Sequence, residues 1–113
     1  MPKTLLAQAK EGARIHDSSR LSLEETHTLL AEGVEKDLIV ARVHTGDPAL
    51  YGAIHEQIQL LQKEGISCDV VPGVTAAFAA AAALGRQFTQ PDGSQTLIFT
   101  RLAGRTPVPE SEN

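Results

Sequence analysis

Two short turns hold the residues of this sequence that are best suited to bind a ligand. They are His44-Thr45-Gly46-Asp47-Pro48 and Pro72-Gly73-Val74-Thr75. Glycine allows a ligand to approach the backbone closely, and the start of a helix presents unpaired amide groups. The carboxylate of Asp47 can accept a hydrogen bond from a ribose hydroxyl or an ammonium group. The same composition is also ordinary in a strand-to-helix turn, so the local pattern leaves a ligand site and a purely structural turn both open.

The other polar residues are weaker candidates for a functional site. His44 stands at the end of an apolar run, beside the first turn, where it could be a ligand contact or a structural residue. Arg42 lies inside that run and needs a polar partner or an exit to solvent. Arg101 and Arg105 follow the last apolar run, where they could meet an anionic substrate or remain solvated. The histidines lack the spacing of a metal site, and no serine–histidine–acid array, phosphate loop or carboxylate pair stands out. The sequence therefore predicts no metal and identifies no catalytic residue.

Alternating elements are predicted to position the two turns. Apolar, largely β-branched runs predict strands over residues 38–43, 66–71 and 95–100, with a weaker candidate over 13–16. Helical spacing of apolar residues predicts helices between them: one opened by a Ser22–Glu25 capping box, one capped by Asp47 and starting at Pro48, and one starting at Ala76. This order predicts an α/β domain with a mostly parallel sheet of about four strands alternating with helices. Ligands of such sheets bind beyond the carboxyl ends of the strands, where both turns would lie.

Composition excludes several classes of protein. The 113 residues include 10 basic and 14 acidic side chains, for a net charge of −4, which argues against a nucleic-acid partner. The longest strongly apolar run, Ala76 to Leu84, is far too short to span a membrane. A single cysteine, Cys68, excludes a disulfide framework and fits a reducing compartment, and we expect it to be a small buried residue. These features predict a cytoplasmic protein with no membrane partner.

Three ordered blocks of the sequence resemble the tetrapyrrole (corrin/porphyrin) methyltransferases. The blocks are Val40–Gln57, Val71–Arg86 and Ser94–Arg101 with Gly104-Arg105. Within that family the pattern is most similar to the enzymes that methylate C11 of precorrin-4 or cobalt-precorrin-4 in cobalamin biosynthesis. This finer resemblance depends on Arg42-Val43-His44, which precede the Gly46-Asp47-Pro48 turn, and on the last of the three blocks.

The resemblance implies a cofactor, a substrate and the residues that bind them. The cofactor would be S-adenosylmethionine, with S-adenosylhomocysteine as the product, and the substrate a tetrapyrrole. The implied cofactor-binding residues are Thr45, Gly46, Asp47, Leu50, Thr75 and Ala76. His44, Arg101 and Arg105 are the candidates for binding the substrate. The two arginines are candidates for its carboxylates, because a guanidinium matches a carboxylate through two hydrogen bonds.

The resemblance also predicts the domain organisation. The family begins with a strand and a glycine-rich loop that have no counterpart before Pro2, and it continues into a second domain after Arg105. Residues 1–105 are thus expected to form part of an N-terminal domain, and residues 106–113 a polar tail or linker. We expect no methyl transfer from the chain by itself. We also expect either a homodimer or self-association through the exposed edge of the sheet.

Two other functions remain open at this point. Another tetrapyrrole methylase, such as a uroporphyrinogen-III C-methyltransferase, would share the cofactor turns and differ in substrate. A non-catalytic α/β module that binds an anionic ligand or a partner chain is an alternative of a different class. Binding of S-adenosylhomocysteine, lost when Asp47 is replaced by alanine, would separate the methyltransferases from such a module.

Overall fold

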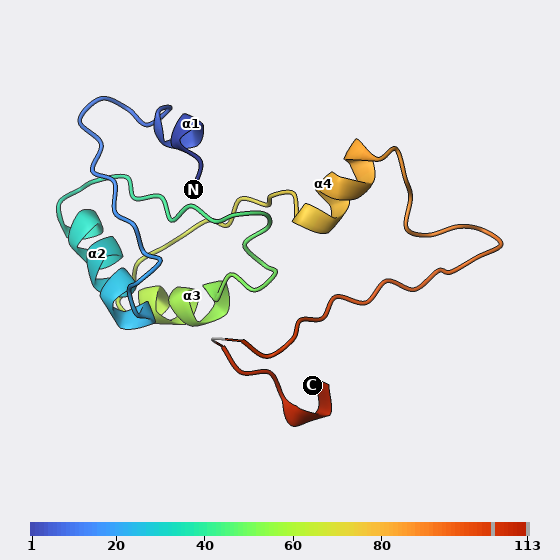
Figure 1. The fold of residues 1–113 in the computed structure, drawn as a ribbon. Helices are drawn as coiled ribbons and strands as arrows, with labels where there is room; N and C mark the ends of the chain where they lie inside the picture. Colours follow the sequence, from blue (N-terminus) through green and yellow to red (C-terminus); the bar gives the residue numbers. More distant parts are fainter. Residues whose placement is uncertain (105, 113) are drawn as a thin grey trace. The chain divides into compact units, whose positions relative to one another are not determined.

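The computed structural model describes residues 1–104 and 106–112. Figure 1 shows that the regular structure of this part of the chain is helical. The elements are α1 (Lys3–Leu6), α2 (Leu23–Glu35), α3 (Ile54–Lys63), α4 (Ala76–Ala83) and the short 3-10 helix η1 (Glu110–Glu112). None of the described helices is long and apolar enough to cross a membrane.

The predicted parallel sheet is absent from the described residues, so the α/β prediction is wrong. Segments 13–16, 38–43, 66–71 and 95–100 have no strand structure, and no backbone hydrogen bond found in the described chain joins any two of them. The side chain of Ile39 is fully exposed and that of Val71 is 77% exposed, whereas strands inside a parallel sheet would bury both. β-branched composition favours an extended backbone, but a strand also needs a neighbouring strand to accept and donate its hydrogen bonds.

The chain divides into two compact units, Met1–Ala76 and Ala77–Asn113. The first unit contains α1, α2 and α3 together with both candidate turns. The second contains nearly all of α4 and the segment that follows it. The division into residues 1–105 and a polar tail stays a prediction.

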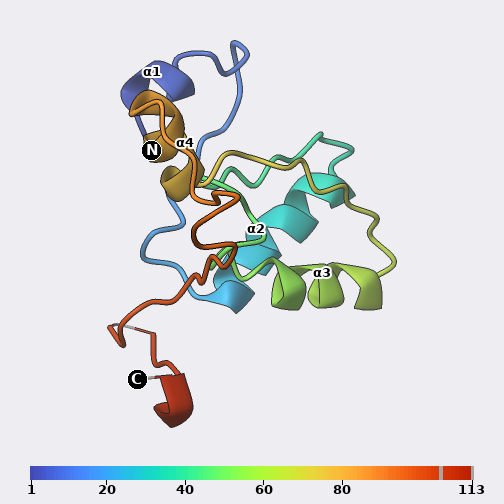
Figure 2. The ribbon, with the colours of Figure 1, turned by 90° about the vertical axis from the view of Figure 1, so that its right-hand side faces the viewer.

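Helices α2 and α3 pack together and contain the buried residues of the first unit (Figures 1 and 2). Thr26 of α2 and Gln57 and Leu61 of α3 are the described residues classed as buried, and only Leu61 is apolar. The packing of this pair therefore depends on polar contacts as well as on apolar burial.

The start of α2 confirms the predicted capping box. The Ser22 hydroxyl accepts a hydrogen bond from the Glu25 amide at 3.1 Å, and the Glu25 carboxylate accepts one from the Ser22 amide at 2.7 Å. These two bonds satisfy backbone donors that have no partner inside the helix.

Helix α3 begins later than predicted. It starts at Ile54 rather than Pro48, so the prediction that Asp47 caps it is wrong. Residues 48–52 form turns instead, and Tyr51 and Ala53 have positive φ angles of 60° and 52° that are incompatible with a continuous right-handed helix.

The second unit contains a small aromatic cluster. The ring of Phe78 in α4 lies edge-on to that of Phe88, with centroids 5.6 Å apart, and 6.0 Å from that of Phe99. Edge-to-face and tilted pairs at these distances are favourable, so they link α4 to the chain that follows it.

Cys68 lies in the first unit, and the prediction that it is buried is wrong, because the structure exposes it.

Candidate functional site

Asp47 joins the two candidate turns. One oxygen of its carboxylate accepts a hydrogen bond from the amide of Ala49 at 2.8 Å, within its own turn. The other accepts one from the amide of Gly73 at 3.0 Å, in the second turn. A single carboxylate thus fixes two loops that are 26 residues apart in the sequence.

The backbones of the two turns are in close contact. A side-chain carbon on Gly73 would lie 2.2 Å from the carbonyl oxygen of Gly46, so only glycine fits there. A carbon on Gly46 would lie 3.5 Å from the Cα of Thr75, and the φ angle of Gly46 is +74°, which other residues rarely adopt. Residues 45–47 and 73–76, which we call the turn pair, therefore form one continuous backbone surface.

Hydrogen bonding and burial set the charges around the turn pair. The amides of Ala49 and Gly73 lower the pKa of Asp47, which keeps its carboxylate ionised. Burial, and then the positive charge of Arg42, lower the pKa of His44 and favour its neutral form. The site thus combines an anionic carboxylate with a neutral imidazole.

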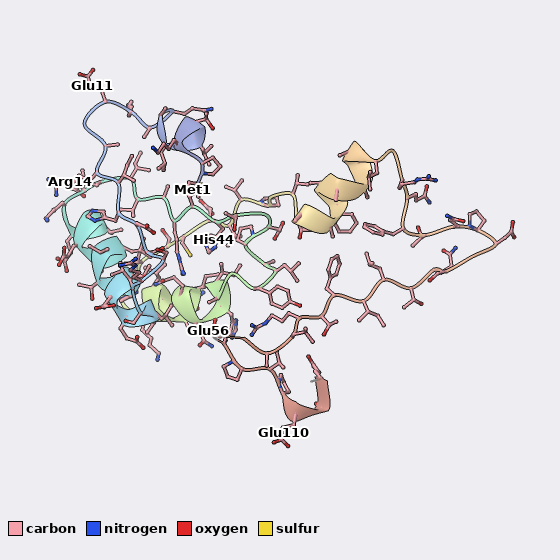
Figure 3. The ribbon with its side chains drawn as sticks, viewed as in Figure 1. Met1, Glu11, Arg14, His44, Glu56 and Glu110 are labelled. Atoms are coloured by element: carbon pink, nitrogen blue, oxygen red, sulfur yellow. The ribbon has the colours of Figure 1, made fainter. Side chains whose placement is uncertain are left out.

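The structure brings most of the predicted cofactor residues together. Thr45, Gly46 and Asp47 contribute the first half of the turn pair, and Thr75 and Ala76 contribute the second. Leu50 is half-buried and donates its amide to the carbonyl of Asp47 at 3.2 Å. His44 is half-buried immediately before the turn pair (Figure 3).

The two predicted arginines are placed differently. The guanidinium of Arg101 donates hydrogen bonds to the carbonyls of Thr106 at 3.3 Å and Pro107 at 3.1 Å, within the second unit. Arg105 lies outside the described residues.

Sequence reasoning missed two contacts of the site. The amide of Gly73 was not identified as the partner of Asp47, although the repetition of a glycine turn after two apolar runs was a signal that both turns belong to one site. Gln57 was not identified as the partner of Arg42, whose guanidinium donates to its side-chain oxygen at 2.9 Å. Only the polarity of Arg42 within an apolar run predicted that some partner must exist.

The turn pair is chemically suited to a small polar cofactor. Thr45, Gly46, Val74 and Ala76 are exposed, so a ligand can reach the residues around the glycine contact. Each Asp47 oxygen accepts one of the two amide hydrogen bonds and retains a lone pair for a second donor. No group of three or more possible metal ligands occurs within residues 1–104 and 106–112.

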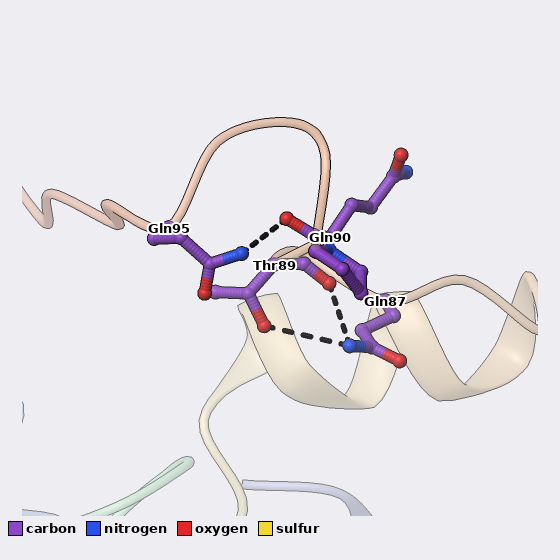
Figure 4. A pocket seen from close by; sticks show the side chains of 5 residues that line it. Gln87, Thr89, Gln90 and Gln95 are labelled. Carbon is purple, nitrogen blue, oxygen red and sulfur yellow. Dashed lines mark hydrogen bonds between the residues drawn. The ribbon is translucent and has the colours of Figure 1, made fainter.

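A separate hollow of about 410 Å³ lies in the second unit (Figure 4). It is lined by Gln87, Thr89, Gln90, Pro91 and Gln95. The Gln87 amide donates to the Thr89 carbonyl at 2.6 Å, and the Gln95 amide donates to the Gln90 carbonyl. Both amides thus already donate to carbonyls that fold the loop around the hollow, which makes it a weaker candidate than the turn pair.

The chain is similar to known proteins over nearly its whole length. The family model for tetrapyrrole (corrin/porphyrin) methylases matches residues 2–112. The chain is 50% identical over 108 residues to a cobalt-precorrin-4 C(11)-methyltransferase of Priestia megaterium, covering 96% of this chain and 42% of the relative. It is 49% identical over 113 residues to a precorrin-4 C(11)-methyltransferase of Pseudomonas aeruginosa, covering 100% of this chain and 45% of the relative.

A solved structure is also similar. It is that of a cobalamin biosynthetic enzyme, a cobalt precorrin-4 methyltransferase, with a TM-score of 0.88 and 49% sequence identity. The match covers 98% of this chain and 46% of that one. The chain thus spans less than half the length of each of these three relatives.

Proposed function

The chain belongs to the tetrapyrrole (corrin/porphyrin) methylase family, and on that premise we propose that it takes part in methyl transfer to C11 of precorrin-4 or cobalt-precorrin-4 in cobalamin biosynthesis. The observation that carries the proposal is the sequence identity of this chain to two C11-methyltransferases, which is 50% over 96% of its length and 49% over 100% of its length. Because it spans less than half of those relatives, methyl transfer is proposed for the whole protein and cofactor binding for these residues.

The turn pair is the proposed binding site for S-adenosylmethionine. The family consists of methyltransferases that use this cofactor. When bound, S-adenosylmethionine supplies a methyl group on a sulfonium leaving group. Thr45, Gly46, Thr75 and Ala76 would bind it mainly through their backbone groups, and Leu50 would add an apolar contact. This assignment is supported by the exposure of Thr45, Gly46 and Ala76 and by the contact between the two halves of the turn pair.

Asp47 has two roles in this proposal. Its hydrogen bonds to the amides of Ala49 and Gly73 hold the turn pair in shape before the cofactor binds. Its lone pairs not used in those bonds can accept a hydrogen bond from a hydroxyl or ammonium group of the cofactor. Such preorganisation lowers the entropic cost of binding and of aligning the reacting groups.

The proposed substrate contacts are His44, Arg101 and Arg105. The lowered pKa of His44 keeps its imidazole neutral near pH 7, so it can donate or accept a hydrogen bond without adding charge. The arginines are proposed to bind the carboxylates of the tetrapyrrole, as guanidinium groups commonly do.

Two further proposals concern the setting of the protein. We propose a cytoplasmic location, supported by a free, exposed thiol at Cys68, which fits a reducing compartment. We also propose that the chain self-associates or forms a homodimer. The sheet edge expected to make that contact is absent from the described residues, and the proposal is supported instead by the exposed apolar side chains.

A chimera tests the proposed function. In it, these 113 residues replace the matching part of the Priestia megaterium relative, and transfer of a labelled methyl group from S-adenosylmethionine to cobalt-precorrin-4 is measured. We expect the chimera to be active, its Asp47→Ala variant to be inactive and its Asp92→Ala variant to match the chimera. A soluble, folded chimera without activity, beside an active parent enzyme, would contradict the proposal.

A further inference from the structure

A chain of side-chain hydrogen bonds leads from the packed helices to the segment before the turn pair. The guanidinium of Arg42 donates to the Gln57 side-chain oxygen at 2.9 Å. The Gln57 amide nitrogen lies 3.1 Å from Nδ1 of His27, and Nε2 of His27 lies 3.0 Å from the carboxylate of Glu64. We call these four residues the polar relay.

The polar relay passes through the most buried described side chain of the helix pair. Gln57 is 4% exposed and the side chain of His27 is 12% exposed, whereas that of Glu64 is 51% exposed. A buried amide without its partners would lose the hydrogen bonds that compensate for its removal from water. Gln57 is therefore the central link of the relay.

The chemistry of the groups fixes the direction of every bond in the relay. Arginine has only donors, so the Gln57 oxygen must accept and its amide nitrogen must donate. His27 then accepts at Nδ1, which leaves the hydrogen on Nε2 to be donated to Glu64. Turning the Gln57 amide over would place donors against the donors of Arg42, so only one arrangement satisfies all the groups.

Arg42 connects the relay to the site. It lies three residues before Thr45, and its charge contributes to the lowered pKa of His44. Among the described residues, no backbone hydrogen bond ties residues 39–46 to another segment, whereas the Arg42–Gln57 bond does so through side chains. The next tie along the chain is the bond between Asp47 and Gly73.

We propose that Gln57 is a positioning residue for the cofactor site, which acts by holding Arg42 and, through it, the segment that carries His44 and Thr45. The inference rests on the proposed function, because it assigns the relay to the same turn pair. His27 and Glu64 act one step further away, by keeping the Gln57 amide in the orientation that Arg42 requires.

The first test is the titration of His44, followed by NMR in the 113-residue chain. Burial, the larger cause of the lowered pKa of His44, does not depend on Gln57, whereas the smaller contribution from the charge of Arg42 does. Replacing Gln57 with leucine frees the guanidinium of Arg42, so we expect that smaller contribution to be lost and the pKa of His44 to rise. Gln62→Leu is the matched control, since Gln62 lies exposed on the same helix with no side-chain hydrogen bond found in the described chain. An unchanged His44 titration in a folded Gln57→Leu variant would overturn the inference, whether or not the chain binds a cofactor.

The second test uses affinity for S-adenosylhomocysteine in a double-mutant cycle. We expect Gln57→Leu to weaken binding by about tenfold, the order expected for an unpaired buried group. Because Gln57 acts through Arg42, the double variant with Arg42→Met should bind no worse than Arg42→Met alone. Gln57→Glu, which keeps an acceptor for Arg42, should restore part of the affinity.

The two tests separate failure of the inference from failure of the proposed function. Additive losses in the cycle, or full affinity in Gln57→Leu, would overturn the positioning role while leaving the cofactor site in place. A wild-type chain with no affinity for S-adenosylhomocysteine would count against the proposed function, and the His44 titration would then decide the inference alone.

Discussion

Gly73 occupies the most restrictive position of the turn pair, because its missing side chain is what lets the two backbones touch. A methyl group there would lie 2.2 Å from the carbonyl oxygen of Gly46, so the backbone of one turn must move. We expect Gly73→Ala to lower the free energy of unfolding by about 1–3 kcal/mol, the usual cost of overpacking. Thermal unfolding measures this, and Gly104→Ala, a site with open space around it, is the control. Equal melting temperatures for the two variants would contradict the close contact.

His44 makes the stability of the first unit depend on pH. Since its pKa in the folded chain is below the ordinary value of 6.5, the unfolded chain binds the proton more readily. The free energy of unfolding should therefore fall as the pH decreases through about 6.5 toward the folded pKa. His44→Gln should remove this part of the pH dependence and His16→Gln, at an exposed site, should retain it. Denaturant unfolding at several pH values measures the difference, and identical profiles for both variants would show that His44 is not responsible.

At the level of single residues, the sequence indicated which residue types could form a site but not which groups they would bond to. The glycines and the aspartate of the first turn were recognisable because their chemistry is local. The bond from Gly73 to Asp47 was not, since it joins residues 26 apart. Gln57 is an ordinary polar residue in the sequence, and only burial between two helices makes it important.

Helix α2 is the element whose sequence and structure agree best, and its capping box can be tested directly. Removing the Ser22 hydroxyl leaves the Glu25 amide without its partner. We therefore expect Ser22→Ala to lower the free energy of unfolding by about 1 kcal/mol. Chemical denaturation followed by helical circular dichroism measures this change. Ser22→Thr keeps a cap oxygen and should retain most of the stability, so an equal loss in both variants would speak against the cap.

The segments predicted to be strands are the elements for which the sequence-based prediction was wrong. Helix α2 was predictable because its hydrogen bonds lie within the segment and its start is set by neighbouring residues. Segments 38–43 and 66–71 have the composition of strands, yet strand formation depends on hydrogen bonds to another segment, which the described residues do not make. The late start of α3 had a similar cause, because the positive φ angles at Tyr51 and Ala53 give no signal in sequence periodicity.

We expect the exposed apolar side chains to determine how the whole molecule associates in solution. Ile39, Val71 and Ile98 are largely exposed, although side chains of this kind are normally buried. We expect the sedimentation coefficient of the chain to increase with concentration as these side chains associate. An Ile39→Lys, Val71→Lys variant should associate less, and Lys3→Ala, a change of surface charge alone, should behave like the wild type. A wild-type chain that stays monomeric at all concentrations would contradict the proposed self-association.

The central claim is that the turn pair joined by Asp47 binds the cofactor of a tetrapyrrole methylase. Isothermal titration calorimetry of the 113-residue chain with S-adenosylhomocysteine tests it most directly. We predict binding at one site, a loss of at least about tenfold in affinity for Asp47→Ala, and no loss for Asp92→Ala. A folded chain that releases no heat of binding, or an Asp47→Ala variant with wild-type affinity, would contradict the claim.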